Sequence, residues 1–235
     1  MQKNDYKSLY KLQDEVLNSG AIHDAFYLTG GTALSRFYLH HRYSEDLDFF
    51  VNRDKDFINY INKTHENLTD NYILNTAKSV ISDDFVRFFV VFDEIALKVE
   101  FVNDVGFRVN KPILFQKTKI DCVANILSNK ITAIASRNEA KDVFDIINIS
   151  NNYSFNWIDI FSFAKNKSLI NEIDVEQRLR TFSIDMLNNV DWHINTFNKN
   201  DLHENLMQLT DDFFLGKDNS LGKDKMSIYE ANIKI

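Results

Sequence analysis

The sequence predicts an α+β protein, in which a mixed-sheet domain over residues 1–115 precedes a helical bundle over residues 116–235. Apolar residues alternate with a period of two in several segments before residue 118, and they recur with a period of 3.6 after it. The single proline, Pro112, and a polar stretch at 116–119 fall where the period changes. The chain is 44% hydrophobic and contains 20 Phe, which is ample material for a core.

The elements of the first domain follow from local patterns. Residues 5–19 place Leu9, Leu12 and Val16 on one helical face. The elements expected after this helix are a strand at 26–29, a helix at 32–41, a strand at 46–52, a helix at 54–67 with Asp54 as N-cap, and strands at 72–74, 85–92 and 95–102. Only Asp93 and Glu94 separate the last two strands, which predicts a tight hairpin. Strand 85–92 is apolar on both faces apart from Arg87, so we expect it to be central and covered on both sides.

The second domain is expected to contain helices only. Ile120, Leu127 and Ile134 belong to one helical apolar face, and a second helix begins near Val143. Three more helices are expected at 157–163, 175–187 and 202–214. The polar tail after Gly216 is expected to be a loosely held terminus.

Composition excludes several classes of protein. The only cysteine, Cys122, excludes an internal disulfide framework and a multi-cysteine zinc site, and it suits a reducing cytoplasm. The first residues lead into mixed polar sequence, so we expect no secretory signal. The longest apolar runs are strand-sized, so no membrane span is expected. A net charge of −7 argues against nonspecific adhesion to nucleic acid.

Two carboxylates lie at alternate positions of the strand that begins near Asp46. Asp46 and Asp48 share one face of this strand, whereas Leu47, Phe49 and Val51 occupy the other. Like charges at this distance repel and raise each other's pKa, which indicates a nearby cation. Mg²⁺ fits because it prefers hard oxygen ligands and substrate phosphates, and Mn²⁺ is an alternative. A solvated strand face or turn is the simpler explanation of an isolated D-x-D.

A third carboxylate is expected on strand 95–102, where Glu100 and Lys98 share the face opposite Leu97 and Val99. Beside Asp46 and Asp48, Glu100 would complete a three-carboxylate metal site. Two magnesium ions about 3.5–4 Å apart could then activate an attacking hydroxyl and stabilise a leaving pyrophosphate.

The turn Gly30-Gly31-Thr32 joins the first strand to the first short helix. Its glycines allow the backbone to approach phosphate oxygens, and the start of the helix offers free N–H donors. A glycine pair alone marks only a turn, but its combination with the D-x-D strand favours a nucleotide site. Arg42, just before that strand, is a candidate phosphate ligand or a residue that caps the loop.

Two segments resemble the AbiEii/AbiGii-type nucleotidyltransferase toxins, which belong to the polymerase-β-like superfamily. The first comprises Gly-Gly-Thr-Ala-Leu at 30–34 with Arg-Tyr-Ser-Glu-Asp-Leu-Asp at 42–48. The second comprises 129–137 with Lys-Asp-Val-Phe-Asp at 141–145, which is similar to the family's Lys…Ala…Arg…Arg/Lys-Asp-x-x-Asp pattern. The resemblance covers about residues 26–149. Glu100 departs from it, because relatives often have Asp at the third carboxylate.

The resemblance implies functional roles for Lys130 and for Asp142 or Asp145. Lys130 would contact the triphosphate, and its charge would then be matched by the nucleotide instead of by the protein. A snorkelling lysine at the edge of an apolar helix face is the alternative. One of the two Asp residues would act as a base or orient Lys130. The alternative for them is an exposed helix face with an ion pair between Lys141 and Asp145.

The resulting hypothesis is a magnesium-dependent enzyme that transfers a nucleoside monophosphate from an NTP to an acceptor hydroxyl. The resemblance implies RNA as the acceptor, at a tRNA 3′ end, and a toxin of a toxin–antitoxin or phage-defence system with a cognate antitoxin. A D-x-D glycosyltransferase would explain Asp46 and Asp48 but neither the glycine turn nor Lys130. A non-catalytic partner-binding module is a third possibility, but such a module would not need Asp46, Asp48 and Lys130. The sequence names neither the nucleotide nor the oligomeric state.

A basic segment over residues 108–141 could guide an RNA backbone, or it could be a solvated surface. Its members are Arg108, Lys111, Lys117, Lys119, Lys130, Arg137 and Lys141, against Asp121 and Glu139, which gives a local charge of +5 (seven minus two).

Overall fold

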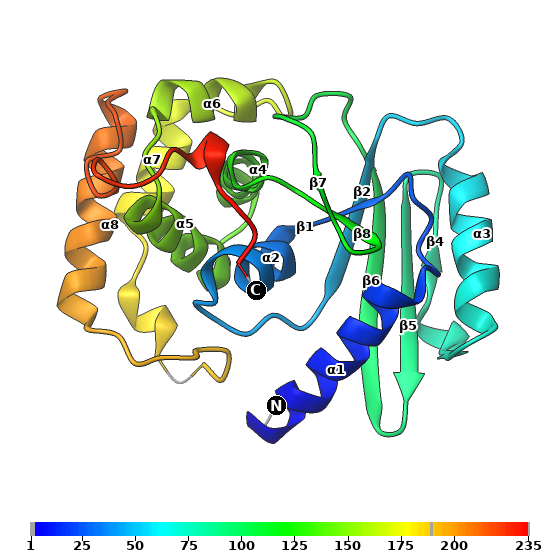
Figure 1. Cartoon of the computed structure of the whole chain (residues 1–235). Helices are drawn as coiled ribbons and strands as arrows, with labels where there is room; N and C mark the ends of the chain where they lie inside the picture. Colours follow the sequence, from blue (N-terminus) through cyan, green and yellow to red (C-terminus); the bar gives the residue numbers. More distant parts are fainter. Residues whose placement is uncertain (1–2, 189, 235) are drawn as a thin grey trace. The chain divides into compact units, whose positions relative to one another are not determined.

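A computed structural model describes residues 3–188 and 190–234, which form two compact units (Figure 1). The first unit comprises the chain up to Ala33, Tyr43–Gly106 and Lys111–Asp121. The second comprises Leu34–Arg42, Phe107–Asn110 and the chain from Cys122 onward. The mixed sheet in the first part of the chain and the helices after it confirm the predicted fold class.

An eight-stranded mixed sheet forms the centre of the first unit, in the order β3-β5-β6-β2-β1-β8-β7, with β4 paired to β5. The strands are β1 (Tyr27–Thr29), β2 (Leu47–Asn52), β3 (Ile73–Leu74), β4 (Val80–Ile81), β5 (Phe85–Phe92), β6 (Ile95–Asp104), β7 (Ile113–Phe115) and β8 (Thr118–Ile120). β2 runs parallel to β6 and β1 parallel to β8, whereas the other pairs are antiparallel. A 3₁₀ turn, η2 (Thr76–Lys78), joins β3 to β4.

Burial alternates along the central strands, so one face of the sheet is buried and the other, which carries the charged residues, is partly exposed. Leu97, Val99 and Phe101 of β6 are fully buried, whereas Lys98 and Glu100 between them are partly exposed. Helix α3 (Phe57–Thr69) packs on the buried face, where its His65 ring contacts the Phe88 ring of β5. Helix α1 (Lys3–Ser19) contacts β6 (Figure 1). The partly exposed face, which carries Lys98 and Glu100, is therefore available for a site.

Three local expectations for the first unit need correction. Asp54 is not the N-cap of α3, because the helix begins at Phe57 and the Asp54 carboxylate accepts from the Asp56 N–H in the preceding turn. Strand 85–92 is not buried on both faces, since burial alternates along it. Residues 113–120 form the short strands β7 and β8, so Ile120 belongs to the sheet and not to a helix. The Asp93–Glu94 hairpin is confirmed, with Phe92 paired to Ile95.

The second unit is built around helix α4 (Val123–Ser136), which contacts α5 (Ala140–Asn152), α6 (Trp157–Lys165) and α7 (Glu172–Arg180) (Figure 1). Helix α8 (Lys199–Phe214) packs against α5, α6 and α7. The 3₁₀ turns are η3 (Ile184–Leu187) and η4 (Ile228–Glu230). The helix expected at 175–187 therefore ends at Arg180 and is followed by a separate turn.

The chain first passes from the first unit to the second within the helix expected at 32–41. Helix α2 (Gly30–Leu34) is followed by a π-helical turn, η1 (Ser35–Leu39), which ends at His40 with a left-handed φ of 51°. The π-turn closes through the hydrogen bond from His40 N to Ser35 O (2.8 Å). This change of direction sets the backbone of His41 and Arg42 within the second unit.

The segment after Gly216 is packed, which contradicts the expectation of a loose terminus. Asn219 is 1% exposed, and its amide donates to the carbonyl oxygens of Ser150 (2.7 Å) and Tyr153 (2.8 Å). The backbone at 226–228 pairs with Ser154. Farther on, Lys234 N donates to Phe37 O (2.7 Å), so this segment also binds η1.

Candidate active site

Three carboxylates lie together on the partly exposed face of the sheet in the first unit. Asp48 of β2 lies directly opposite Glu100 of the parallel strand β6, and Asp46 immediately precedes β2. Period-two alternation places Asp46 and Asp48 on the same face. The structure therefore brings together the three residues that the sequence predicts as metal ligands.

Two cations from neighbouring positions neutralise part of this negative charge. Lys98 Nζ lies 2.9 Å from Asp46 Oδ2 and 3.3 Å from Glu100 Oε2. Arg87 lies opposite Glu100 across the hairpin, and its Nε donates to Glu100 Oε1 at 2.6 Å. Neither cation is in the predicted ligand set. The hairpin register locates Arg87, since counting along both strands from the Phe92–Ile95 pair brings Arg87 opposite Glu100, whereas Lys98 shares the face of Glu100 two positions away on the same strand.

The ionisation of these carboxylates differs because their surroundings differ. Burial, together with the charges of Asp46 and Glu100, raises the pKa of Asp48 to about 7. Burial also acts to raise the pKa of Glu100, but the hydrogen bond from Arg87 and the charge of Lys98 outweigh it and lower that pKa. The cluster thus contains one carboxyl, Asp48, whose negative charge is not fully compensated by the protein.

Gly30 brings the backbone of the first turn against Asp48. Its φ of +69° is left-handed, and a Cβ atom at this position would lie 2.8 Å from Asp48 Oδ2. Only glycine combines this conformation with such a close approach. The sequence thus requires glycine at the point where the turn meets the carboxylate.

Thr32 fixes the loop that leads into β2. Its side chain is fully buried, with Oγ1 2.8 Å from Ser44 Oγ and in hydrogen-bond contact with the Asp46 carbonyl oxygen. Gln13 of α1 donates to the Ser44 carbonyl (3.1 Å) from the other side. These contacts hold the backbone of Asp46. A direct contact of Thr32 or Gly31 with nucleotide stays a prediction.

The donor set of the cluster fits a hard divalent cation. Three carboxylates converge, Asp48 retains uncompensated charge, and the Lys98 ammonium already lies between Asp46 and Glu100 as a cation would. Across the described ranges, no group of three or more His, Cys, Asp or Glu side chains is already placed to hold a metal ion, and Lys98 lies between Asp46 and Glu100. Asp46, Asp48 and Glu100 are therefore the residues that could hold a metal.

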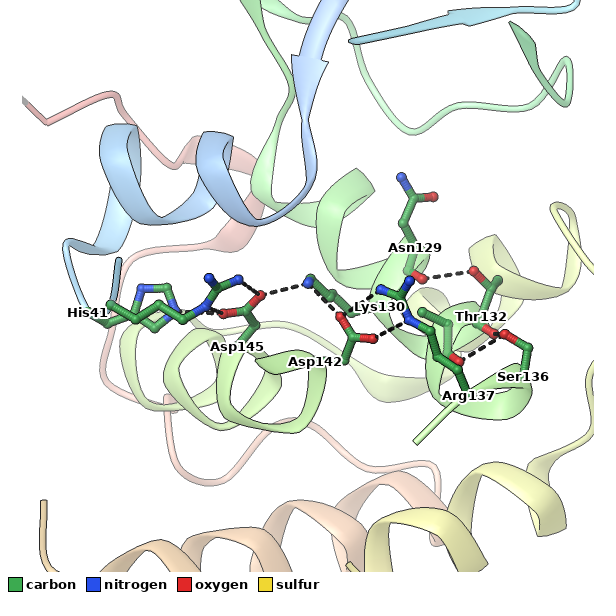
Figure 2. A network of polar contacts seen from close by, with 10 residues as sticks. His41, Asn129, Lys130, Thr132, Ser136, Arg137, Asp142 and Asp145 are labelled. Atoms are coloured by element: carbon green, nitrogen blue, oxygen red, sulfur yellow. Dashed lines mark hydrogen bonds and ion pairs between the residues drawn. The ribbon is translucent and has the colours of Figure 1, made fainter. Parts of the chain in front are cut away.

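The second unit contains a separate ion-pair network, which Figure 2 shows in close-up. Lys130 extends from α4 toward α5, where its Nζ lies 2.7 Å from Asp142 Oδ1 and 2.7 Å from Asp145 Oδ2. Arg137 Nε donates to Asp142 Oδ2 at 2.8 Å. Burial acts to raise the pKa of Asp142, but Lys130 and Arg137 lower it.

Asp145 is the most heavily paired carboxylate of this network. Arg42 binds it through two hydrogen bonds, from Nε at 2.6 Å and from Nη2 at 2.8 Å. His41 Nε2 lies 2.8 Å from Asp145 Oδ1. Although burial acts to raise the pKa of Asp145, the charges of Arg42 and Lys130 hold it well below its usual value. Asp145 is thus a buried anion that fixes residues from three segments of the chain.

Both alternatives for the downstream residues are wrong. Asp142 and Asp145 are 1% and 0% exposed, so they do not form an exposed helix face. Lys130 is buried and doubly paired, so it is not a snorkelling lysine. The positive charge of Lys130 is balanced by the carboxylates of Asp142 and Asp145. We had expected the nucleotide, and not the protein, to balance it. A contact between Lys130 and a triphosphate stays a prediction.

The comparison with known protein families identifies the class of this protein. The family described as nucleotidyl transferase AbiEii toxin, type IV toxin–antitoxin system, matches residues 14–211. The chain therefore belongs to the AbiEii family of nucleotidyltransferase toxins and is a nucleotidyltransferase. No match was found among curated proteins.

Solved structures share the fold at low sequence identity. JHP933 from Helicobacter pylori is 20% identical, with a TM-score of 0.60, over 92% of this chain and 94% of that chain. A second H. pylori structure gives the same identity and TM-score over 92% and 96% of the two chains. MenT4, a nucleotidyltransferase toxin from Mycobacterium tuberculosis, is 18% identical with a TM-score of 0.46, over 78% and 66%. The H. pylori structures support the fold alone. Within the described residues, no helix combines the length and apolarity that crossing a membrane requires.

Proposed function

We propose that the protein transfers a nucleoside monophosphate from an NTP to a hydroxyl group of RNA, at a tRNA 3′ end, and releases pyrophosphate in a magnesium-dependent reaction. Manganese is the alternative ion. The family supports nucleotidyl transfer by a toxin, and the metal, nucleotide and acceptor are our inferences. The observation that carries them is the convergence of Asp46, Asp48 and Glu100 beside the Gly30 turn.

The residues of the first unit would hold the metal and present it to the nucleotide. Asp46, Asp48 and Glu100 supply the hard oxygen ligands that Mg²⁺ prefers. When bound, magnesium would activate the acceptor hydroxyl and stabilise the leaving pyrophosphate. Arg87 restrains Glu100, and Thr32 restrains the backbone of Asp46. Gly30 and Gly31 would let the backbone approach the phosphate oxygens.

The residues of the second unit would supply fixed positive charge. Asp145 locks Arg42 through two hydrogen bonds, and Asp142 with Asp145 holds Lys130. A cation held in this way does not lose side-chain entropy when it meets an anion, which favours phosphate binding. Asp142 therefore acts by orienting Lys130 and not as a base, since its pKa is lowered. We also propose that residues 1–115 carry the metal site and residues 116–235 the helical domain.

The partners and the location in the cell are also proposals. The type IV toxin–antitoxin family supports a cognate antitoxin. We further propose a role in toxin–antitoxin function or phage defence, and a location in the cytoplasm, where NTP and tRNA are present. The basic segment over 108–141 supports RNA binding less strongly than its composition alone indicates. Lys130 and Arg137 share the Asp142 carboxylate, and Lys130 also contacts Asp145, so the charges of two of its seven cations are partly offset within the protein.

Incubation with each labelled NTP, Mg²⁺ and total RNA tests this function. We expect label in a discrete RNA band with the wild-type protein and none with Asp48→Ala. The variant should melt no lower than wild type, because it removes a carboxyl that is repelled by Asp46 and Glu100. Equal incorporation by Asp48→Ala would remove the metal site from the proposal. Label in every RNA size class, without a discrete band, would remove the tRNA acceptor.

A further inference from the structure

Lys98 lies where a metal ion would have to bind. Its ammonium is 2.9 Å from Asp46 Oδ2 and 3.3 Å from Glu100 Oε2, and these two oxygens belong to residues on different strand segments. Lys98 therefore forms an ion pair with each of these two carboxylates. The side chain remains 28% exposed, so the ammonium can move away into solvent.

Arg87 makes the two oxygens of Glu100 unequal. It binds Oε1 from the neighbouring strand β5, which leaves Oε2 directed at Lys98. The Glu100 carboxylate therefore has one oxygen held by a guanidinium from the neighbouring strand and the other held by the ammonium of Lys98, two positions away on its own strand.

We propose that Lys98 is a tethered counter-ion that occupies the metal position in the free enzyme and must be displaced when the metal binds. This inference rests on the proposed metal site at Asp46, Asp48 and Glu100. Without metal, Lys98 neutralises carboxylates that would otherwise repel one another. With metal, the doubly charged ion replaces the single charge between Asp46 and Glu100. Lys98 is thus a positioning residue that sets how tightly the metal binds.

Lys98→Met tests the proposal because it keeps the apolar stem and removes the charge. Mn²⁺ binding is measured by electron paramagnetic resonance and by calorimetry on metal-free full-length protein, so that no enzyme activity is needed. We expect Lys98→Met to bind Mn²⁺ roughly tenfold more tightly than wild type, since the ion no longer competes with an ammonium. Its melting temperature should be lower than wild type without metal and should recover with saturating Mn²⁺.

Three further variants make the outcome specific. Lys98→Arg keeps the charge and should retain an affinity close to that of wild type, and exposed Lys55→Met should change neither readout. Lys98→Gln is a second uncharged variant, which replaces Lys98→Met in the test if Lys98→Met folds poorly. It should also bind Mn²⁺ more tightly than wild type does. Wild-type affinity in both uncharged variants would overturn the counter-ion role while leaving the metal site intact. Absence of Mn²⁺ binding by wild type and by every variant would overturn both the role and the metal site.

Discussion

Asp145 is a buried residue whose position is fixed by ion pairs and hydrogen bonds as much as by packing. Arg42, Lys130 and His41 all contact its carboxylate, although Arg42 is 103 residues away in the sequence. A buried carboxylate with fewer partners would be neutral or destabilising. The sequence singled out both Asp145 and Arg42 as candidate site residues, but it did not predict that they pair with each other. A pairing over that separation depends on the tertiary fold and leaves no local periodicity.

Lys130→Met should lower stability, because Asp142 and Asp145 lose the ammonium that they share. Each carboxylate keeps one arginine, Arg137 or Arg42, so we expect a loss near the lower end for a broken buried pair, about 3 kcal/mol. Urea unfolding measures the loss, with exposed Lys223→Met as the control. Wild-type stability in Lys130→Met would contradict the network. If Lys130 also binds the triphosphate, NTP titrations should show a deficit of roughly 1.5–3 kcal/mol.

His41 should make stability depend on pH between neutral and mildly acid conditions. Burial lowers the pKa of His41 from 6.5, and this effect outweighs the opposing hydrogen bond to Asp145. As the pH falls through 6.5, His41 becomes protonated in the unfolded chain but stays neutral in the folded protein. The folded state therefore loses stability relative to the unfolded state. His41→Gln should lack this part of the decline when melting temperatures are compared from pH 7.5 to 5.5. Identical slopes for His41→Gln and wild type would show that His41 titrates normally.

Elements of the sheet differ in how much of them the sequence reveals. Strands β2, β5 and β6 have six residues or more, long enough to be recognised, and the Asp93–Glu94 turn fixes the register of β5 with β6. The sequence of β5 is largely apolar on both faces, so the alternation of burial along it was not predictable. The segments that form β7 and β8 have three residues each, which is too short for a period of two to be recognised. Asp48 and Glu100 lie on the long strands, and Asp46 immediately precedes one of them. Their common face, and that of Lys98, was therefore predictable, whereas the contact from Arg87 required the register.

The turn from β1 to α2 should be sensitive to Gly30→Ala for two separate reasons. The left-handed φ of +69° strains any other residue by roughly 1–2 kcal/mol, and the new Cβ would lie 2.8 Å from Asp48 Oδ2. Gly20→Ala is a matched control, since Gly20 has a φ of +78° but its nearest atoms belong to the flexible Lys117 side chain at 3.7 Å. Both variants should melt lower, but only Gly30→Ala should weaken Mn²⁺ binding and transfer. Equal transfer by the two variants would separate Gly30 from the site.

At the scale of the whole molecule, the chain after Gly216 is part of the folded second unit. Its sequence is polar and contains Gly222, which suggested a loose end, but Asn219 and the backbone near 226–228 form hydrogen bonds, and the Ile228 side chain is buried. Such bonds have no periodic signature. The division of the molecule at residue 115 stays a prediction.

Asn219→Ala should destabilise the second unit by about 1–3 kcal/mol, because the buried carbonyl oxygens of Ser150 and Tyr153 lose their donor. Asp224→Ala, at an exposed position of the same segment, should have no comparable effect. Urea unfolding of both variants decides the matter. A wild-type midpoint for Asn219→Ala would mean that the segment is held loosely after all.

The central claim is that this protein transfers a nucleoside monophosphate with a metal held by Asp46, Asp48 and Glu100. The most direct test incubates the protein with RNA, Mg²⁺ and the same NTP labelled either at the α-phosphate or at the γ-phosphate. We predict that RNA acquires the α label only, that the γ label appears in pyrophosphate, and that Asp48→Ala produces neither. Transfer of the γ label to RNA, or α-label transfer that persists in Asp48→Ala, would contradict the claim.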